Sequence, residues 1–529
     1  MAGITAAWEL SDPARPDRHE VTVYQRGWRL GGKGASSRGP HGRIEEHGLH
    51  VWLGIYDNAF RLVREAYEEL DRGRTDPGSP IATWQDAFSP ANSIGVEERF
   101  GQDWSHWVAS FAGNDLRPGL DPGGAVPGRP LAMIAFLERG ARLLADLSRS
   151  IRPAVAPAPA TVVLSGSPTA PAQRSSPSAG EIAAFLRQAE ITAMIAAVES
   201  LRLVQAVLPR PVALVGDLLE RLDRSRIELV RALESSEDSR RLWQFADLLI
   251  ACMQGALRDG LFLHAADFSR IDHLDFREWL ARNGACRETL DSPLVRGLHD
   301  LVFAYEDGDP ARPRFAAGLG LFLSTKLFFD YKGAIFWRLQ AGMGDVVFAP
   351  LYEALRARGV TFRFFHRVDA LHLDDDRRAI AAISLGRQAQ VVGGADYEPL
   401  VRVKGLACFP SRPRREQLSG DVAADLEAAW ADRRTEQPVR LEAGRDFDDV
   451  VLATSIGMVP LVCGELLDDS PRWREMVRSV ATVPTQALQV WLRLDEPQLG
   501  WRHEGAMVSG YVTPFETYAS MTHTLALED

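Results

Sequence analysis

The chain has 529 residues, a formal net charge of −11 at pH 7, and the apolar and charged fractions of an ordinary soluble globular protein. This length allows two or three domains with large cores. The acidic balance argues against a nucleic-acid-binding protein, because phosphate binding requires a basic face, and we expect no nucleic-acid partner.

The four cysteines, Cys252, Cys286, Cys408 and Cys463, lie far apart and form no C-x-x-C pair. This spacing indicates neither a disulfide framework nor a zinc site and is typical of a reducing cytosol. The N-terminus has no signal-peptide pattern, and no apolar run reaches the roughly 18 residues of a spanning helix. We therefore expect a cytoplasmic protein without a metal site, and a peripheral contact with a membrane stays open.

The first residues have the pattern of the middle of a dinucleotide-binding unit, which runs strand, glycine-rich turn, helix, strand. Gly3 stands where the third glycine of G-x-G-x-x-G would stand, and a predicted helix at 4–10 and a predicted strand at 21–24 follow it. The first strand and the first two glycines of such a unit are not in the sequence. We therefore expect nucleotide-cofactor binding, in a chain truncated at this end.

A glycine-rich segment directly follows the predicted strand. In Arg29-Leu30-Gly31-Gly32-Lys33-Gly34 the glycines free the backbone to present N–H groups to an anion, and Arg29 and Lys33 add positive charge. A flexible surface turn is the alternative, but the position after a strand of βαβ type favours anion binding. A helix is predicted at 57–70, with Asp57 as its N-cap.

The middle of the chain is predicted to be mainly helical. Breaks are expected at 118–130 and at 152–180, and the second, rich in Pro, Ala and Ser, is predicted to be a mobile surface insertion. Helical periodicity runs from 181 to 260, and a further helix is expected to start at Asp275. The apolar stretch 318–329 could line a tunnel for a lipid-like substrate, but a place in the core is favoured.

An α/β pattern returns after residue 342, where Gly342-Met343-Gly344-Asp345 precedes a predicted helix at 346–358. Strands are predicted at 360–364, 366–373, 379–384 and 449–454. The last of these is a near-continuous apolar run, as expected of a buried parallel strand.

Three segments carry a resemblance when they are taken together: x-x-G-I-T-A-A-W-E-L, V-T-V-Y-Q-x-x-x-R-L-G-G-K and E-E-H-G-L-H-V-W. Their combination resembles the superfamily of flavin-dependent amine oxidases and phytoene desaturases. The resemblance implies an α/β fold with a glutathione-reductase-like FAD-binding Rossmann domain that is discontinuous in sequence. Residues 1–100 and 335–529 would form this domain, and residues 101–334 would form a largely helical substrate part.

The resemblance also implies a set of cofactor-binding residues: Gly3, Gln25, Arg29, Gly31, Gly32, Lys33, Gly48, His50, Val368, Ala453 and Thr454. The arginine–glycine segment would lie on the FAD pyrophosphate, and Gly48 and His50 would lie near the flavin ring. Gln25 stands where the superfamily usually has a Glu that holds the ribose hydroxyls. The superfamily's closing glycine–aspartate turn has no counterpart before Asp529, which predicts truncation at this end as well.

The implied activity is that of an FAD-dependent oxidoreductase that removes hydride from a small, apolar, isoprenoid-like substrate. In such enzymes the flavin performs the redox chemistry, and we name no catalytic residue. Two alternatives stay open: a truncated fragment or pseudoenzyme that binds no flavin, and an NAD(P)-binding protein. The sequence gives no indication of the oligomeric state.

Overall fold

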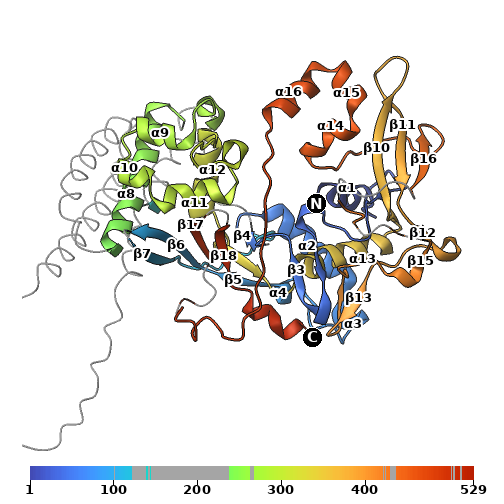
Figure 1. The fold of residues 1–529 in the computed structure, drawn as a ribbon, viewed down its shortest axis with the longest axis horizontal. Helices are drawn as coiled ribbons and strands as arrows, with labels where there is room; N and C mark the ends of the chain where they lie inside the picture. The colour runs from blue at the N-terminus through green and yellow to red at the C-terminus, as the bar shows by residue number, and fades with distance from the viewer. Residues whose placement is uncertain are drawn as a thin grey trace, which may run out of the picture.

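The computed structural model describes residues 1–49, 51–100, 102–121, 139–140, 143, 237–261, 267–420, 422, 425–428, 436–501, 503, 507–512 and 515–528. The predicted insertion at 152–180, most of the predicted break at 118–130, the helical pattern from 181 to 236 and His50 lie outside these residues. Figure 1 shows two groups of elements, with α8 to α12 on one side and α1, α2 and α13 on the other. Within the described residues, no helix is long and apolar enough to cross a membrane.

The first group pairs the start of the chain with its second half. Strand β1 (Thr22–Tyr24) runs parallel to β9 (Thr361–Arg363), and the helices packed around them are α1 (Ala2–Leu10), α2 (Asp57–Leu70) and α13 (Ala349–Ala357). The guanidinium of Arg358 lies 3.5 Å from the ring centre of Trp8 and donates to the Trp8 carbonyl oxygen at 2.8 Å. The predictions of an α/β pattern, of both N-terminal helices and of both strands are confirmed.

The predicted cap of α2 is wrong. The N-cap position is occupied by Tyr56, and no side chain caps the helix. The Asp57 carboxylate instead accepts hydrogen bonds from the Gly119 N–H at 3.0 Å and from the Lys332 ammonium at 2.6 Å. A buried ammonium without a charged partner costs more free energy than an uncapped helix end. The Asp57 carboxylate therefore binds Lys332 and does not cap α2.

A three-stranded antiparallel sheet follows β9: β10 (His366–Leu373), β11 (Ile380–Arg387) and β16 (Gln437–Glu442). Three short helices, α14 (Val459–Val462), α15 (Gly464–Asp469) and α16 (Pro471–Ser479), lie beside it. Leu371 of the sheet and Val459 of α14 belong to one buried cluster. The strand predicted at 366–373 is confirmed, and the strand predicted at 379–384 extends further, to Arg387.

The predicted buried strand at 449–454 is wrong. These residues are not part of any strand, and the Val451 side chain is 59% exposed. An apolar run forms a buried strand only if a neighbouring strand completes its hydrogen-bond ladder, and none of the described strands pairs with this segment.

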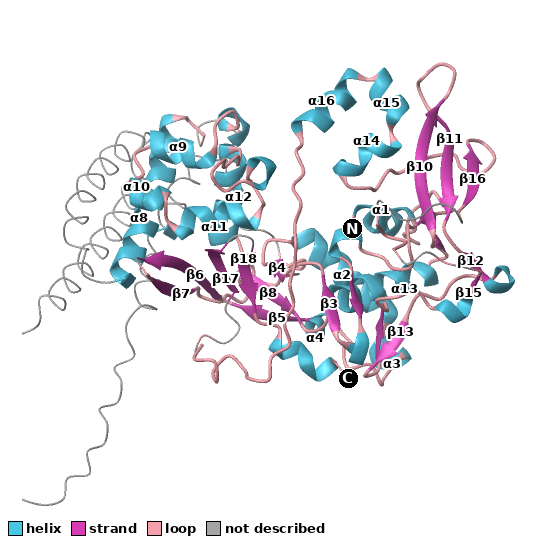
Figure 2. Ribbon diagram, in the orientation of Figure 1, coloured by secondary structure: helices cyan, strands magenta, loops and turns pink. Residues whose placement is uncertain are grey.

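The second group combines sheets with helices (Figure 2). One sheet has the order β18 (Phe515–Ala519), β17 (Met507–Val512), β6 (Ser93–Phe100), β7 (Asp103–Ser110), and another has the order β4 (Val51–Leu53), β8 (Phe336–Leu339), β5 (Phe88–Ala91). The helices are α8 (Glu237–Arg258), α9 (Phe276–Arg282), α10 (Arg287–Leu290), α11 (Pro293–Leu301) and α12 (Ala317–Phe329).

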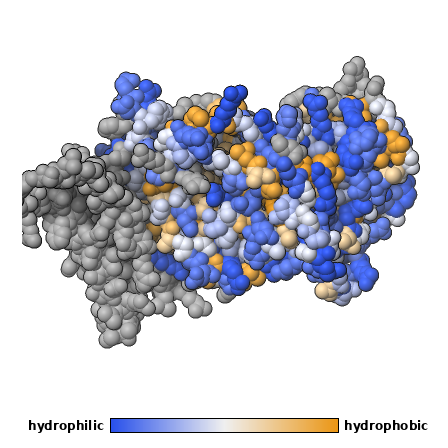
Figure 3. Space-filling view, turned by 90° about the horizontal axis from the view of Figure 1, so that it is seen from below, coloured by the Kyte–Doolittle hydropathy of each residue, from blue (hydrophilic) through white to orange (hydrophobic). Residues whose placement is uncertain are grey.

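Helix α12 contains the apolar stretch that the sequence places at 318–329. Leu321 packs in one cluster with Phe276 and Trp279 of α9, whereas Leu319 is exposed. The interpretation as core is therefore confirmed for the inner face of this helix. Elsewhere, apolar residues are scattered among polar ones on the face seen in Figure 3.

Asp275 is the confirmed N-cap of α9, and it also joins this helix to its neighbours. Its Oδ1 accepts from the Arg277 N–H at 2.8 Å, and its Oδ2 accepts from the Phe315 N–H at 2.7 Å. Burial raises the pKa of Asp275, but hydrogen bonds from His299 and from backbone N–H groups outweigh it and leave the pKa below its ordinary value. The ionised carboxylate therefore stabilises the fold.

We expect Asp275→Ala to lower the free energy of unfolding by about 2 kcal/mol at pH 7 through loss of the cap and of the Phe315 bond. Because the folded-state pKa is lowered, this stabilisation is present at neutral pH and is lost as pH falls through the folded-state pKa. The difference between wild type and variant in urea unfolding should therefore shrink in acid. An equal difference at pH 7 and in acid would contradict this assignment.

Candidate dinucleotide site

The end of β1 is held by the junction between β9 and β10. The Gln25 N–H donates to the Arg363 carbonyl oxygen, and the Gln25 carbonyl oxygen accepts from the His366 N–H, both at 2.9 Å. The Gln25 side-chain amide donates to the Arg26 carbonyl oxygen at 2.7 Å. The residue predicted to hold the ribose therefore makes a local hydrogen bond in this structure.

The glycine-rich segment forms a tight turn with left-handed backbone angles. Gly31 has φ +117° and Gly32 has φ +58°, and the Gly34 N–H donates to the Gly31 carbonyl oxygen at 3.1 Å. A Cβ at Gly31 would lie 2.8 Å from the Ala35 backbone and 2.9 Å from the Phe348 ring, whereas a Cβ at Gly32 would meet open space. Gly31 is thus required by both conformation and packing.

The two cations of this segment have different surroundings. Arg29 donates to both carboxylate oxygens of Glu427, at 2.6 to 3.1 Å, and to the Ser37 hydroxyl at 2.7 Å. Lys33 is exposed, and within the described residues no hydrogen bond or ion pair engages its ammonium. Arg29 therefore ties the turn to the Glu427 segment, and Lys33 is the cation that an incoming anion would meet.

The segment predicted to lie near a flavin ring is fixed to the same turn. A hairpin of β2 (Ser36–Arg38) and β3 (Ile44–Glu46) leads into it. His47 Nδ1 donates to the Ala35 carbonyl oxygen at 2.6 Å. A Cβ added at Gly48 would meet none of the described residues within 4 Å. His50 lies outside the described residues.

Segments from the two ends of the sequence also meet at α1. A Cβ at Gly3 would lie 2.9 Å from the Cβ of Ala453, so the glycine permits this close approach. Val368 of β10 packs against the cluster that Leu452 and Ile456 also cover. Thr454 is exposed. The structure thus brings Gly3 close to Ala453, and it places Val368 and Leu452 against the same buried cluster.

Sequence reasoning missed a buried ion pair between the hairpin and the helix that follows Gly342. Arg38 Nε lies 2.9 Å and Nη2 2.8 Å from Asp345 Oδ2, and the two side chains are 2% and 1% exposed. Burial raises the pKa of Asp345 to about 6, and the Arg38 charge opposes this rise. The charges are 307 positions apart in sequence, and neither forms a motif that could have revealed the pair.

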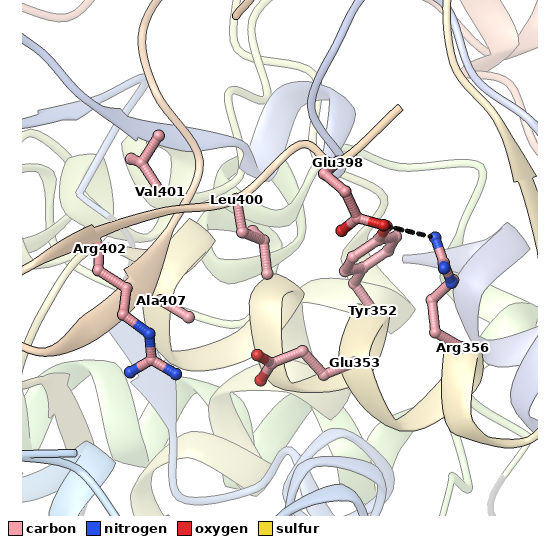
Figure 4. A pocket seen from close by; sticks show the side chains of 8 residues that line it. All are labelled: Tyr352, Glu353, Arg356, Glu398, Leu400, Val401, Arg402 and Ala407. Carbon is pink, nitrogen blue, oxygen red and sulfur yellow. Dashed lines mark hydrogen bonds and ion pairs between the residues drawn. The ribbon is translucent and has the colours of Figure 1, made fainter. Parts of the chain in front are cut away.

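A pocket of about 340 Å³ lies between α13 and β13 (Val401–Val403), as Figure 4 shows. Its charged groups already have partners: Arg356 pairs with Glu398 at 3.4 Å, Arg402 with Asp76 at 2.8 Å, and Glu353 with Arg72. With two carboxylates and two guanidinium groups in its lining, this pocket does not have the cationic character that a dinucleotide pyrophosphate requires.

Comparisons with known proteins concern the N-terminal segment. Residues 1–66 match the family model of an NAD(P)-binding Rossmann-like domain. The zeta-carotene desaturases (chloroplastic/chromoplastic) of Capsicum annuum and Arabidopsis thaliana are each 39% identical to this chain over 69 residues, 13% of the chain. That of Zea mays is 40% identical over 65 residues, 12% of the chain.

These matches span 11 to 12% of the length of the relatives, so they describe one segment and not a whole enzyme. That segment contains α1, β1, the glycine turn, the β2–β3 hairpin and the start of α2. Over this segment, the chain is similar to NAD(P)-binding Rossmann-like domains and to zeta-carotene desaturases.

Proposed function

We propose that this protein is an FAD-dependent oxidoreductase of the desaturase type, which removes hydride from a small, apolar, isoprenoid-like substrate. The observation that carries the proposal is the glycine turn after β1, within a segment similar to zeta-carotene desaturases. The turn fits an anionic pyrophosphate, because Gly32 and Gly48 leave open space and Lys33 offers a charge that none of the described residues engages. The discontinuous, glutathione-reductase-like arrangement and the helical substrate part belong to this proposal.

Bound FAD would supply the redox chemistry by accepting hydride. In the proposed site, the backbone of Gly31 and Gly32 and the Lys33 ammonium would bind the pyrophosphate, and Arg29 would hold the turn through Glu427. Gln25 would release its local hydrogen bond to reach the ribose, Val368 would meet the adenine, and the segment of Gly48 and His50 would meet the flavin ring. The remaining proposed members of the site are Gly3, Ala453 and Thr454. We place the protein in the cytoplasm, with a peripheral membrane contact as the route to an apolar substrate.

The test is a titration of the purified chain with FAD, followed by quenching of flavin fluorescence and by the absorption bands of the retained flavin. FMN is the matched control, because it has the same isoalloxazine ring and one phosphate but lacks the adenosine monophosphate part of FAD. We expect FAD to bind and FMN to bind much more weakly. A folded protein that binds neither flavin would overturn the proposal in favour of a fragment or pseudoenzyme.

A second candidate is an NAD(P)-binding protein. It is favoured by the description of the matching family model. Titration with NADH and with NADPH, read from nicotinamide fluorescence, separates it from the first candidate. Tighter binding of a nicotinamide dinucleotide than of FAD would replace the proposed cofactor.

Lys33→Ala is expected to weaken FAD binding about tenfold, because one charge-assisted contact to phosphate is worth about 1.5 kcal/mol. The free energy of unfolding should change by less than about 0.5 kcal/mol, because the side chain is exposed. Arg472→Ala, which removes an exposed charge from α16, is the matched control and should leave FAD affinity unchanged. Equal affinities for both variants would remove Lys33 from the site.

A further inference from the structure

The buried pair of Arg38 and Asp345 joins the hairpin after the glycine turn to the π-helical turn η5 (Gly344–Phe348). We propose that these two are positioning residues: their pair holds η5 where Phe348 sets the shape of the Gly31–Gly34 turn, and thereby controls dinucleotide affinity. This inference rests on the proposed cofactor site. It concerns residues that do not themselves contact the dinucleotide.

The physical path runs from the ion pair through η5 to the turn. The Gly344 N–H donates to the Ser36 hydroxyl at 2.6 Å, so η5 is bound to β2 beside Arg38. The Phe348 ring at the other end of η5 would lie 2.9 Å from a Cβ at Gly31 and 3.5 Å from one at Gly34. A displacement of η5 therefore moves the surface on which the turn rests.

Arg38 also fixes segments outside η5. Its Nη1 donates to the Gly42 carbonyl oxygen at 2.9 Å and to the Leu527 carbonyl oxygen at 2.7 Å. Asp345 Oδ2 in turn accepts from the Gly342 N–H at 3.0 Å. One guanidinium and one carboxylate thus hold three backbone groups, at Gly42, Leu527 and Gly342. Such support from behind a binding loop is how second-layer side chains set the geometry of a site.

Stability does not account for the pair. Burial raises the pKa of Asp345 to about 6, so its ionised form is less favourable in the fold than in the unfolded chain. Asp345 Oδ1 is also buried, and no N–H or O–H group of the described residues donates to it. A buried pair with these properties is weak evidence for stabilisation, and a role in holding one geometry is its better explanation.

The other titratable groups that face Asp345 come from three elements. They are Glu46 of β3, Cys408 of β14 (Leu406–Cys408) and Tyr67 of α2. Burial raises the pKa of both Cys408 and Tyr67 far above neutrality, so neither changes charge between pH 5 and pH 8. Protonation of Asp345 near pH 6 would therefore release Arg38 and loosen η5.

The first experiment measures the FAD affinity of Arg38→Met/Asp345→Leu by flavin fluorescence. This double variant replaces the pair by apolar side chains of similar size, and we expect affinity to fall by about tenfold or more while the protein stays folded. The matched control is Arg241→Met/Glu98→Leu, which removes the pair that joins α8 to β6 at 2.8 Å; its Arg241 is buried and its Glu98 is 21% exposed. This control should bind FAD as wild type does.

The second experiment follows the FAD dissociation constant of wild type and of Asp345→Asn from pH 5 to pH 8. Wild-type affinity should weaken severalfold as pH falls through about 6. The FAD affinity of Asp345→Asn should be weak and should not change with pH over this range. This measurement keeps the proposal testable if the double variant does not fold.

The possible results separate the inference from the proposed function. Wild type that binds FAD, together with a double variant of unchanged affinity or a flat wild-type pH profile, would overturn the positioning role and leave the proposed function intact. Equal weakening in the Arg241/Glu98 control would also overturn it, because the effect would then be general. Wild type that binds no FAD would overturn the proposed function and the inference together.

Discussion

Gly31→Ala is expected to lower the free energy of unfolding by about 3 kcal/mol and to abolish dinucleotide binding. An alanine at φ +117° is strained, which costs about 1–3 kcal/mol, and its methyl group would push the Ala35 backbone or the Phe348 ring away. The loss in stability is measured by urea unfolding, and the loss in binding is measured by titration with FAD.

Gly32→Ala is the matched control for this prediction. Gly32 also has a left-handed backbone, at φ +58°, but a Cβ there would meet no atom of the described residues within 4 Å. Gly32→Ala should lower the free energy of unfolding by about 1 kcal/mol, because only the left-handed backbone conformation is strained. If the two alanine variants were equally stable, the contact with Phe348 would not determine the shape of the turn.

Arg38→Met is expected to destabilise the protein by about 3–5 kcal/mol, because it leaves the Asp345 carboxyl buried without its charge partner. Arg38→Met/Asp345→Leu should instead be as stable as wild type within about 1 kcal/mol, or more stable, because both desolvated charges are gone. Urea unfolding of the three proteins at pH 7 measures the difference. A double variant as unstable as the single one would show that the pair stabilises the fold.

The pH dependence of the same comparison has a definite sign. The folded-state pKa of Asp345 is about 6, above the ordinary 3.8, so between these values the folded chain binds more protons at this site than the unfolded chain. The stability that Asp345 contributes therefore falls as pH rises from about 4 to about 6. Over this window, the double variant should gain stability relative to wild type.

The local sequence pattern was sufficient to predict several helices and strands. The helix at 57–70 matches the predicted bounds because Leu62, Val63 and Ala66 recur on one buried face. The prediction of a strand at 366–373 is also confirmed. Its alternating pattern could be interpreted locally, because this strand pairs with the next strand in the sequence in an antiparallel sheet. The requirement for glycine at Gly31 was likewise visible in the segment that follows β1.

Features that depend on distant partners could not be predicted. The run at 449–454 has the composition of a buried strand, but composition does not show which strand completes the ladder. Asp57 has the sequence position of a helix cap, but its carboxylate binds the Lys332 ammonium instead. The Arg38–Asp345 pair and the Arg29–Glu427 pair each join segments more than 300 positions apart.

The parallel pairing of β1 with β9 has a consequence during protein synthesis. Thr22 pairs with Thr361, so 339 residues separate the two halves of this ladder. At about 5–20 residues per second, a ribosome needs roughly 20 to 70 seconds to deliver the second half after the first has emerged. During that interval the nascent N-terminal segment exposes an unpaired strand and the apolar face of α1, which makes it a client for chaperones that shield growing chains.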